Sequence, residues 1–106
     1  MATLGDFQTL DLRVATITAA ELHPNADRLL VLRIDLGGEQ RQIVAGIRAS
    51  YEPQALVGKQ IVVVANLDPA KLRGVESQGM LLAARDGDRV VILGPDAGVT
   101  PGSKVS

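Results

Sequence analysis

Apolar and polar residues alternate with a period of two along most of this chain, as they do in β-strands with one buried face. The clearest alternation lies in residues 30–36, where four aliphatic side chains face one way and Arg33 and Asp35 face the other. Gly37 and Gly38 follow and permit the positive φ of a hairpin turn. Residues 41–47 are therefore expected to form a third strand that pairs back on the second.

The first segment, residues 10–22, is longer and changes phase. Its apolar positions are even-numbered up to Val14 and then odd-numbered at Ala15, Ile17 and Ala19. A slip of one residue exchanges the buried and exposed faces of a strand, so we expect a bulge or strong bend near Val14 and Ala15. A long, bent first strand that serves two faces is what a small closed barrel requires.

The rest of the chain contains one helical signal and further strands. Pro53 suits a first helical turn and Gly58 suits a helix end, which predicts a short helix or helical turn within residues 50–57. The other expected elements are a strand at 60–67, an irregular loop at 66–78, strands at 79–84 and 89–93 joined by Asp86-Gly87-Asp88, and a turn-rich tail over the barrel surface.

This order predicts a single all-β domain spanning residues 1–106. It is the order of the OB-fold, a five-stranded Greek-key barrel, here with a short helix between strands 3 and 4 and a C-terminal hairpin and tail. SH3-like barrels and other small barrels give similar patterns, so the order by itself does not separate them.

Composition narrows the class of protein. Apolar residues make up 46% of the chain, and Phe7 and Tyr51 are its only aromatic residues, so the core must be aliphatic. The absence of cysteine excludes disulfides, thiolate metal sites and a cysteine nucleophile. No signal peptide is recognisable, and the longest apolar run, Ile61 to Ala65, is far below the roughly 20 residues of a membrane span. We expect a soluble, cytoplasmic protein without a membrane partner.

Residues suited to catalysis are scarce. His23 is the only histidine, and because it precedes Pro24 in a loop, it is expected to face solvent or pack in a turn. The chain has no HExxH motif, P-loop or GxGxxG motif. Asp86-Gly87-Asp88 lacks the downstream ligands of a calcium loop and fits a hairpin turn better. The prediction is a non-enzymatic domain without a cofactor or metal.

The segment Asn66–Met80 is the strongest candidate for function. It is long and polar, and it joins two apolar strands, which is typical of a binding loop. It offers amides, cations and a hydroxyl of the kind that contact phosphates, sugars and base edges, namely Asn66, Lys71, Arg73, Ser77 and Gln78. Its charge is balanced by Asp68 and Glu76. A plain surface loop, whose polar groups satisfy its own backbone, is the alternative.

The net charge of −1 argues mildly against a nucleic-acid partner. The charge is unevenly distributed, with a balance of −3 in residues 1–27, +2 in residues 28–48 and zero in the remainder. Any phosphate binding should therefore be moderate and sensitive to salt.

At Asn66–Met80 the sequence becomes recognisable. It resembles the tRNA-binding domain family found at the C-terminus of bacterial methionyl-tRNA synthetases, in free-standing tRNA-binding proteins, in the β-subunit of phenylalanyl-tRNA synthetase and in the endothelial monocyte-activating polypeptide. The matching pieces, in order, are Asp6-Phe7, Leu10–Val14, His23–Leu29, Arg41–Gly46, Leu56–Lys59, Val64–Leu67, Leu72–Leu82, Pro95–Gly98 and Pro101-Gly102. Each piece alone is weak, but together in this order and spacing they are specific.

The resemblance implies an OB-fold that recognises tRNA by shape rather than sequence, within or beside an aminoacyl-tRNA synthetase. It also implies a homodimer, as in bacterial members. The family pattern carries a binding role onto Arg28, Asn66, Ser77 and Met80, with Lys71 and Arg73 as phosphate contacts and Arg41 and Arg13 ranked lower. The near absence of aromatic residues disfavours base stacking and fits recognition of a folded RNA.

Two other functions remain open. One is a peptide-binding, chaperone-like protein, since a secretion-associated chaperone family has a related barrel and an aliphatic groove could hold an extended peptide. The other is a dimerisation module with little affinity for RNA. Residues 61–65 and 80–84 are apolar on both faces, which favours a dimer unless the helix and tail cover them.

Overall fold

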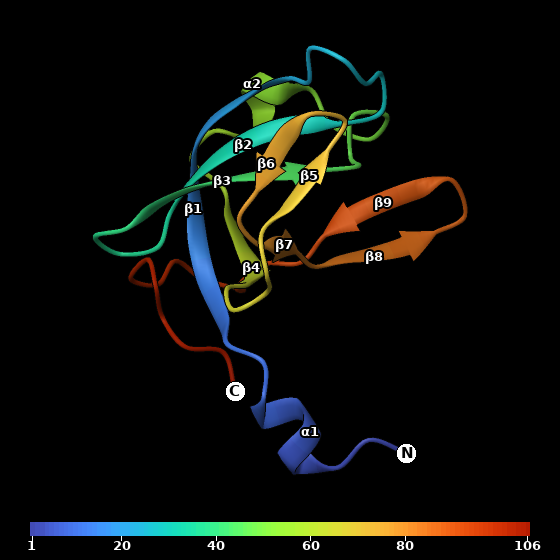
Figure 1. The fold of residues 1–106 in the computed structure, drawn as a ribbon. Helices are drawn as coiled ribbons and strands as arrows, with labels where there is room; N and C mark the ends of the chain where they lie inside the picture. The colour runs from blue at the N-terminus through green and yellow to red at the C-terminus, as the bar shows by residue number, and fades with distance from the viewer.

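Strand β1 (Leu12–Leu22) organises the sheet in the computed structural model, which describes residues 1–106. Its first half pairs with β4 (Gln60–Val64) and its second half with β2 (Leu30–Asp35), both antiparallel. One long strand thus serves two sides of a barrel, as the change of phase predicted (Figure 1).

The predicted position of the bulge is wrong. The register of β1 against β2 shifts between Ile17 and Ala19, beyond the expected site at Val14 and Ala15. Val14 and Ala15 are both buried, but only Ala15 belongs to the main core. The change of phase therefore marks a strand buried on both faces in its first half.

The five-stranded sheet has the order β3-β2-β1-β4-β7, where β3 spans Gln40–Ala45 and β7 spans Met80–Leu81. A fourth strand that returns beside the first gives the Greek-key topology. The short helix α2 (Pro53–Leu56) lies between β3 and β4, as predicted, and packs against β1 with Leu56 fully buried. This nearly closed barrel is the OB-fold.

The core of the barrel is aliphatic, as composition required. Thirteen buried residues form one cluster, and Tyr51 packs at its edge. The Tyr51 hydroxyl accepts a hydrogen bond from the backbone N–H of Ile92, at 3.1 Å, and the Ser50 hydroxyl accepts one from Val90, also at 3.1 Å. These contacts attach a hairpin to the barrel.

That hairpin consists of β8 (Ala83–Asp86) and β9 (Arg89–Ile92), and it extends away from the barrel in Figure 1. The expected continuous strand at 79–84 is thus wrong, because the chain leaves the barrel sheet after β7 and enters the hairpin. Asp86-Gly87-Asp88 lies at the turn, as predicted, and Gly87 has a positive φ of 59°.

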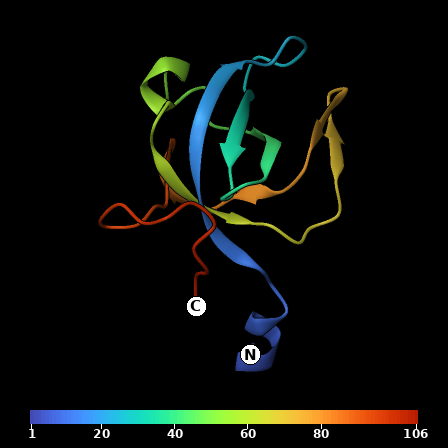
Figure 2. The same cartoon turned by 90° about the vertical axis from the view of Figure 1, so that its left-hand side faces the viewer.

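The two ends of the chain behave differently. Helix α1 (Leu4–Gln8), which the sequence analysis missed, begins with a capping box between Thr3 and Asp6 and has no buried residue. Figures 1 and 2 both show it projecting from the barrel. The C-terminal tail instead runs along β1, where the backbone of Lys104 forms an isolated antiparallel β-bridge with that of Arg13. This agrees with the expectation of a tail that lies over the barrel. None of the helices is long and apolar enough to cross a membrane.

Candidate nucleic-acid interface

The segment after Asn66 is a β-hairpin, so the prediction of an irregular loop at 66–78 is wrong. Strand β5 (Ala70–Leu72) pairs with β6 (Val75–Ser77), and the turn consists of Arg73 and Gly74. Both turn residues have positive φ, at 54° and 89°. This is the geometry of a two-residue hairpin turn that matches the twist of its strands. Arginine rarely adopts it, which is why the turn escaped the sequence analysis.

The base of the hairpin closes the barrel through side chains. The Ser77 hydroxyl accepts a hydrogen bond from the N–H of Val44 at 2.9 Å, and the Gln78 amide oxygen accepts one from the N–H of Gln42 at 3.1 Å. The N–H of Gln78 donates to the carbonyl of Gln42 at 2.8 Å. Side-chain acceptors thus replace part of a backbone ladder at the exposed edge of β3.

Arg41 braces the same edge. Its guanidinium donates to the carbonyl of Ala65 and, at 3.4 Å, to the carbonyl of Gln78, while its Nε is 2.8 Å from the Glu39 carboxylate. Its side chain is only 23% exposed. The hydrogen bond from Arg41 lowers the pKa of Glu39 from its ordinary value. This arginine is largely committed to partners within the chain.

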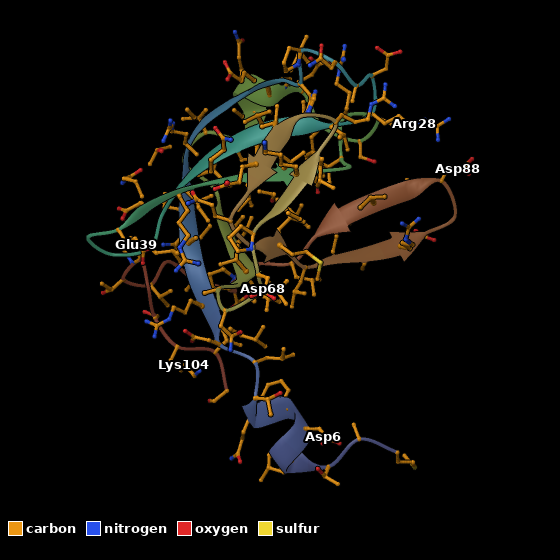
Figure 3. All side chains as sticks on the ribbon, in the orientation of Figure 1. Asp6, Arg28, Glu39, Asp68, Asp88 and Lys104 are labelled. Atoms are coloured by element: carbon orange, nitrogen blue, oxygen red, sulfur yellow. The ribbon has the colours of Figure 1, made fainter.

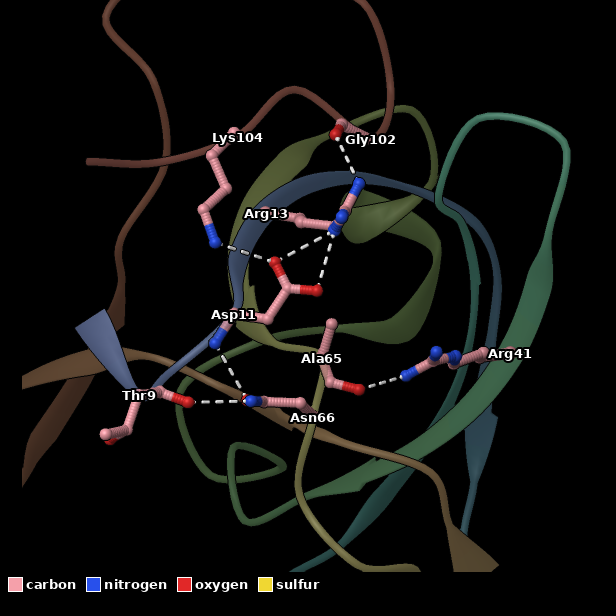
Figure 4. Close-up of polar contacts among 8 residues, drawn as sticks. All are labelled: Thr9, Asp11, Arg13, Arg41, Ala65, Asn66, Gly102 and Lys104. Atoms are coloured by element: carbon pink, nitrogen blue, oxygen red, sulfur yellow. Dashed lines mark hydrogen bonds and ion pairs between the residues drawn. The ribbon is translucent and has the colours of Figure 1, made fainter. Parts of the chain in front are cut away.

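Asn66 ties the N-terminal segment to the end of β4. Its amide nitrogen donates to the carbonyl of Thr9 and its amide oxygen accepts from the N–H of Asp11, both at 2.8 Å (Figure 4). The Asp11 carboxylate receives hydrogen bonds from Lys104 and Arg13 at 3.0 Å, which hold its pKa below the ordinary value of 3.8. Asp11 and Arg13 thus form an ion pair.

The cations at the hairpin tip are arranged differently. Lys71 and Arg73 are exposed, and Arg73 lines a shallow, mainly polar pocket together with residues 25–29 of the β1–β2 loop. Arg28 also lines this pocket, and it lies at the upper right of the barrel in Figure 3. Two guanidinium-bearing residues that are far apart in sequence are thus brought to one surface depression.

Met80 lies apart from these cations. It is 49% exposed and lines an apolar groove between the end of β3 and the segment that runs from β7 into β8. The structure thus places Arg28, Lys71, Arg73 and Met80 on the surface, and it places Asn66, Ser77, Gln78 and Arg41 in contacts that hold the surrounding segments.

The residue that the sequence analysis undervalued is His23. Its side chain is buried, and both ring nitrogens lie 2.9 Å from partners, with Nδ1 accepting from the N–H of Asn25 and Nε2 facing the carbonyl of Leu72. Of the two expected environments, solvent is wrong and packing in a turn is confirmed. The contact with Leu72 could not be foreseen, because 48 residues separate the two positions.

Comparison with known proteins decides the family. The family described as "Putative tRNA binding domain" matches residues 12–104. The chain belongs to this tRNA-binding domain family. Its relatives include the methionine–tRNA ligases of Thermotoga maritima, 61% identical over 98% of this chain, and of Thermococcus kodakarensis, 56% identical over 97%. The chain spans only 16% and 14% of the length of those two ligases.

Solved structures agree with the family fold. A MetRS-related protein from Pyrococcus horikoshii covers the whole chain with a TM-score of 0.93 and 34% identity. The chaperone CsaA from Bacillus anthracis also covers the whole chain, with a TM-score of 0.91 and 38% identity. Both neighbours are matched over nearly their full length, 98% and 99%. Each of these two solved chains therefore consists almost entirely of this domain.

Proposed function

We propose that the chain binds tRNA by shape, independently of sequence, in the cytoplasm. It serves methionyl-tRNA synthetase either as a C-terminal domain or as a separate protein that acts in trans. The observation that carries the proposal is the convergence of Arg28 and Arg73, from two distant loops, on one polar pocket. Guanidinium groups match phosphate geometry, and a pair of them suits the backbone of a folded RNA.

Base stacking contributes little to this mode of binding. Phe7 lies on the projecting helix α1, and Tyr51 is partly buried with its hydroxyl bonded to Ile92. Barrels that bind single strands use exposed aromatic platforms, and this one offers none on the side of the β5–β6 hairpin. Binding must therefore rely on contacts with phosphates and 2′-hydroxyls, whose positions depend on the shape of the RNA.

The candidate residues divide into two roles. Arg28, Lys71 and Arg73 contact the RNA directly, because they are exposed around the hairpin and the β1–β2 loop. Met80 contacts it from the separate groove that it lines. The other four, which are Asn66, Ser77, Gln78 and Arg41, hold these segments in place through the contacts described above.

Homodimerisation is part of the proposal. A single barrel with a net charge of −1 and few phosphate contacts should bind weakly, and two sites on one dimer gain avidity when one tRNA spans both. Helix α1 supports a second copy as the partner. A five-residue helix that buries none of its residues is not stable by itself, yet α1 and the residues after it expose Leu4, Phe7 and Leu10.

The shape claim is tested by competition. Labelled tRNA bound to the full chain is challenged with an unlabelled methionine tRNA, an unlabelled tRNA of another identity, and a single-stranded RNA of equal length. We expect the two tRNAs to compete equally and the single strand to compete weakly. If the single strand competes as well as the tRNAs, the claim of recognition by shape is contradicted. If one tRNA competes much better than the other, the claim that binding is independent of sequence is contradicted.

A peptide-binding function is the second candidate. Eight of the ten residues that line the groove beside Met80 are hydrophobic, and the similar CsaA protein of Bacillus anthracis is titled a chaperone. A labelled apolar peptide distinguishes the two functions. Saturable peptide binding by a chain that does not bind tRNA would favour this candidate, whereas tRNA binding without peptide binding would exclude it.

A further inference from the structure

A single buried imidazole joins two loops that lie far apart in sequence. The β1–β2 loop (residues 23–29) and the tip of the β5–β6 hairpin lie side by side in Figures 1 and 2. His23 belongs to the first loop, and its Nε2 is 2.9 Å from the carbonyl of Leu72 in the second. A weaker contact supports this one, since Arg73 donates to the carbonyl of Asn25 at 3.3 Å.

The ring is held in one chemical state by its partners. Nδ1 accepts a hydrogen bond from the backbone N–H of Asn25, so this nitrogen carries no proton. Nε2 faces a carbonyl oxygen, which only accepts, so the proton lies on Nε2. With 5% of its surface exposed, His23 has no room to exchange these partners for water. The neutral ring therefore acts as a two-ended connector.

The hairpin tip depends on this connector. The base of the hairpin is fixed to β3 by Ser77 and Gln78, but every residue of β5 and both turn residues are exposed. An isolated two-stranded hairpin is marginally stable in water. The bond from His23 to Leu72 and the weaker Arg73–Asn25 contact are the hydrogen bonds that join the tip to the β1–β2 loop.

The connector also joins the two segments that carry the arginines. Arg73 follows Leu72 directly, and Arg28 lies in the loop that starts with His23, so the bond keeps the backbones that carry Arg28 and Arg73 close together beside the pocket. We propose that His23 is a positioning residue for RNA binding, whose neutral imidazole joins the two loops so that Arg28 and Arg73 meet the same stretch of phosphate backbone. This rests on the tRNA binding proposed above.

Two substitutions separate the ends of the connector. An asparagine amide lies near the position of Nδ1, so H23N keeps the contact with Asn25 and loses the one with Leu72. A glutamine amide reaches the position of Nε2, so H23Q keeps the donor for Leu72. We expect H23N to weaken tRNA binding by about 3- to 10-fold, because loops must then be ordered on binding. H23Q should stay within about 2-fold of the unsubstituted chain.

A double-mutant cycle with R73A distinguishes positioning from general damage to the fold. If His23 acts by placing Arg73, then H23N should cost almost nothing further in the R73A background. A merely structural effect would lower affinity by the same factor in both backgrounds and would overturn the proposal, as would an H23N chain that binds like the unsubstituted one. If H23N does not fold, a folded H23Q chain that loses 10-fold in affinity overturns it equally.

The two proposals fail in distinguishable ways. An unsubstituted chain that does not bind tRNA contradicts the proposed function itself. An unsubstituted chain that binds tRNA, with an affinity that does not depend on residue 23, contradicts only the role of His23.

Discussion

The hydroxyl of Ser77 accepts a hydrogen bond from the N–H of Val44, 2.9 Å away, and donates one to the carbonyl of Gly79. Val44 and Ser77 are both buried, so S77A would leave a buried N–H without an acceptor. We expect a loss of about 1–3 kcal/mol in the free energy of unfolding, measured by urea denaturation.

The matched control for S77A is S103A. It also removes a serine hydroxyl, but this one donates to the carbonyl of Thr100 in an exposed hydrogen bond. This change should stay within about 0.5 kcal/mol of the unsubstituted chain. An S77A chain no less stable than S103A would mean that Ser77 does not close the barrel.

Lys71 and Arg73 should contribute much more to RNA affinity than to the stability of the barrel. Replacing both with alanine should lower tRNA affinity and reduce the slope of log affinity against log salt by about one unit for each lost phosphate contact. The control is R85A/R89A, which removes the same charge from the β8–β9 hairpin. Filter binding at several salt concentrations checks both variants, and equal losses in the two would place the site elsewhere on the barrel.

The C-terminal tail should be sensitive to a single methyl group. A Cβ at Gly102 would collide with the carbonyl of Leu36, whereas a Cβ at Gly38 would meet nothing, although both residues have positive φ, at 90° and 96°. Both substitutions therefore introduce similar backbone strain, but only G102A also introduces a steric collision. We expect G102A to be less stable than G38A by about 1–3 kcal/mol in urea denaturation. Equal losses would show that the tail is not packed against this turn.

The lowered pKa of Asp11 gives the fold a defined response to acid. Because Lys104 and Arg13 favour the ionised carboxylate in the folded chain, its contribution to stability is present above pH 3.8 and is lost as the pH falls through the lower native pKa. D11N should therefore be less stable than the unsubstituted chain at neutral pH and equal to it in strong acid. D68N, at an exposed carboxylate with no bound cation, is the control. A pH-independent difference for D11N would contradict the ion-pair account.

The proposed dimer should depend on the apolar N-terminal segment. Replacing Phe7 and Leu10 with serine should convert a dimer into a monomer, because these side chains are exposed and have no core of their own. V57S is the control, since Val57 is at least as exposed as Phe7 and Leu10 but lies beyond α2 on the barrel. Size-exclusion chromatography with light scattering measures the mass. A monomeric unsubstituted chain at micromolar concentration would contradict the dimer.

Much of the barrel could be predicted from the alternation of residue types. The alternation in residues 30–36 clearly indicates one buried face, and Pro53 and Gly58 mark the two ends of the helix. The bounds of β2 and α2 were therefore predicted to within a few residues. The hairpin at Arg73-Gly74 was missed because arginine gives no signal for a left-handed turn. Helix α1 was missed because its stability does not come from burial in this chain.

The site was harder to predict, for a physical reason. Residue type indicates what a side chain is able to bind, but not whether another part of the chain already occupies it. Asn66, Ser77 and Gln78 have the groups that RNA requires, yet their side chains are bonded to Thr9, Val44 and Gln42. His23 was discounted for lying beside a proline, although its partner is a carbonyl in a distant hairpin.

The most direct test of the central claim is tRNA binding by this chain across a salt series. If Arg28, Lys71 and Arg73 meet the phosphate backbone, tRNA should bind at low salt, and log affinity should fall linearly with log salt with a slope of about −0.7 to −0.9 for each phosphate contacted. Absence of binding at low salt, or binding that salt does not weaken, would contradict the account.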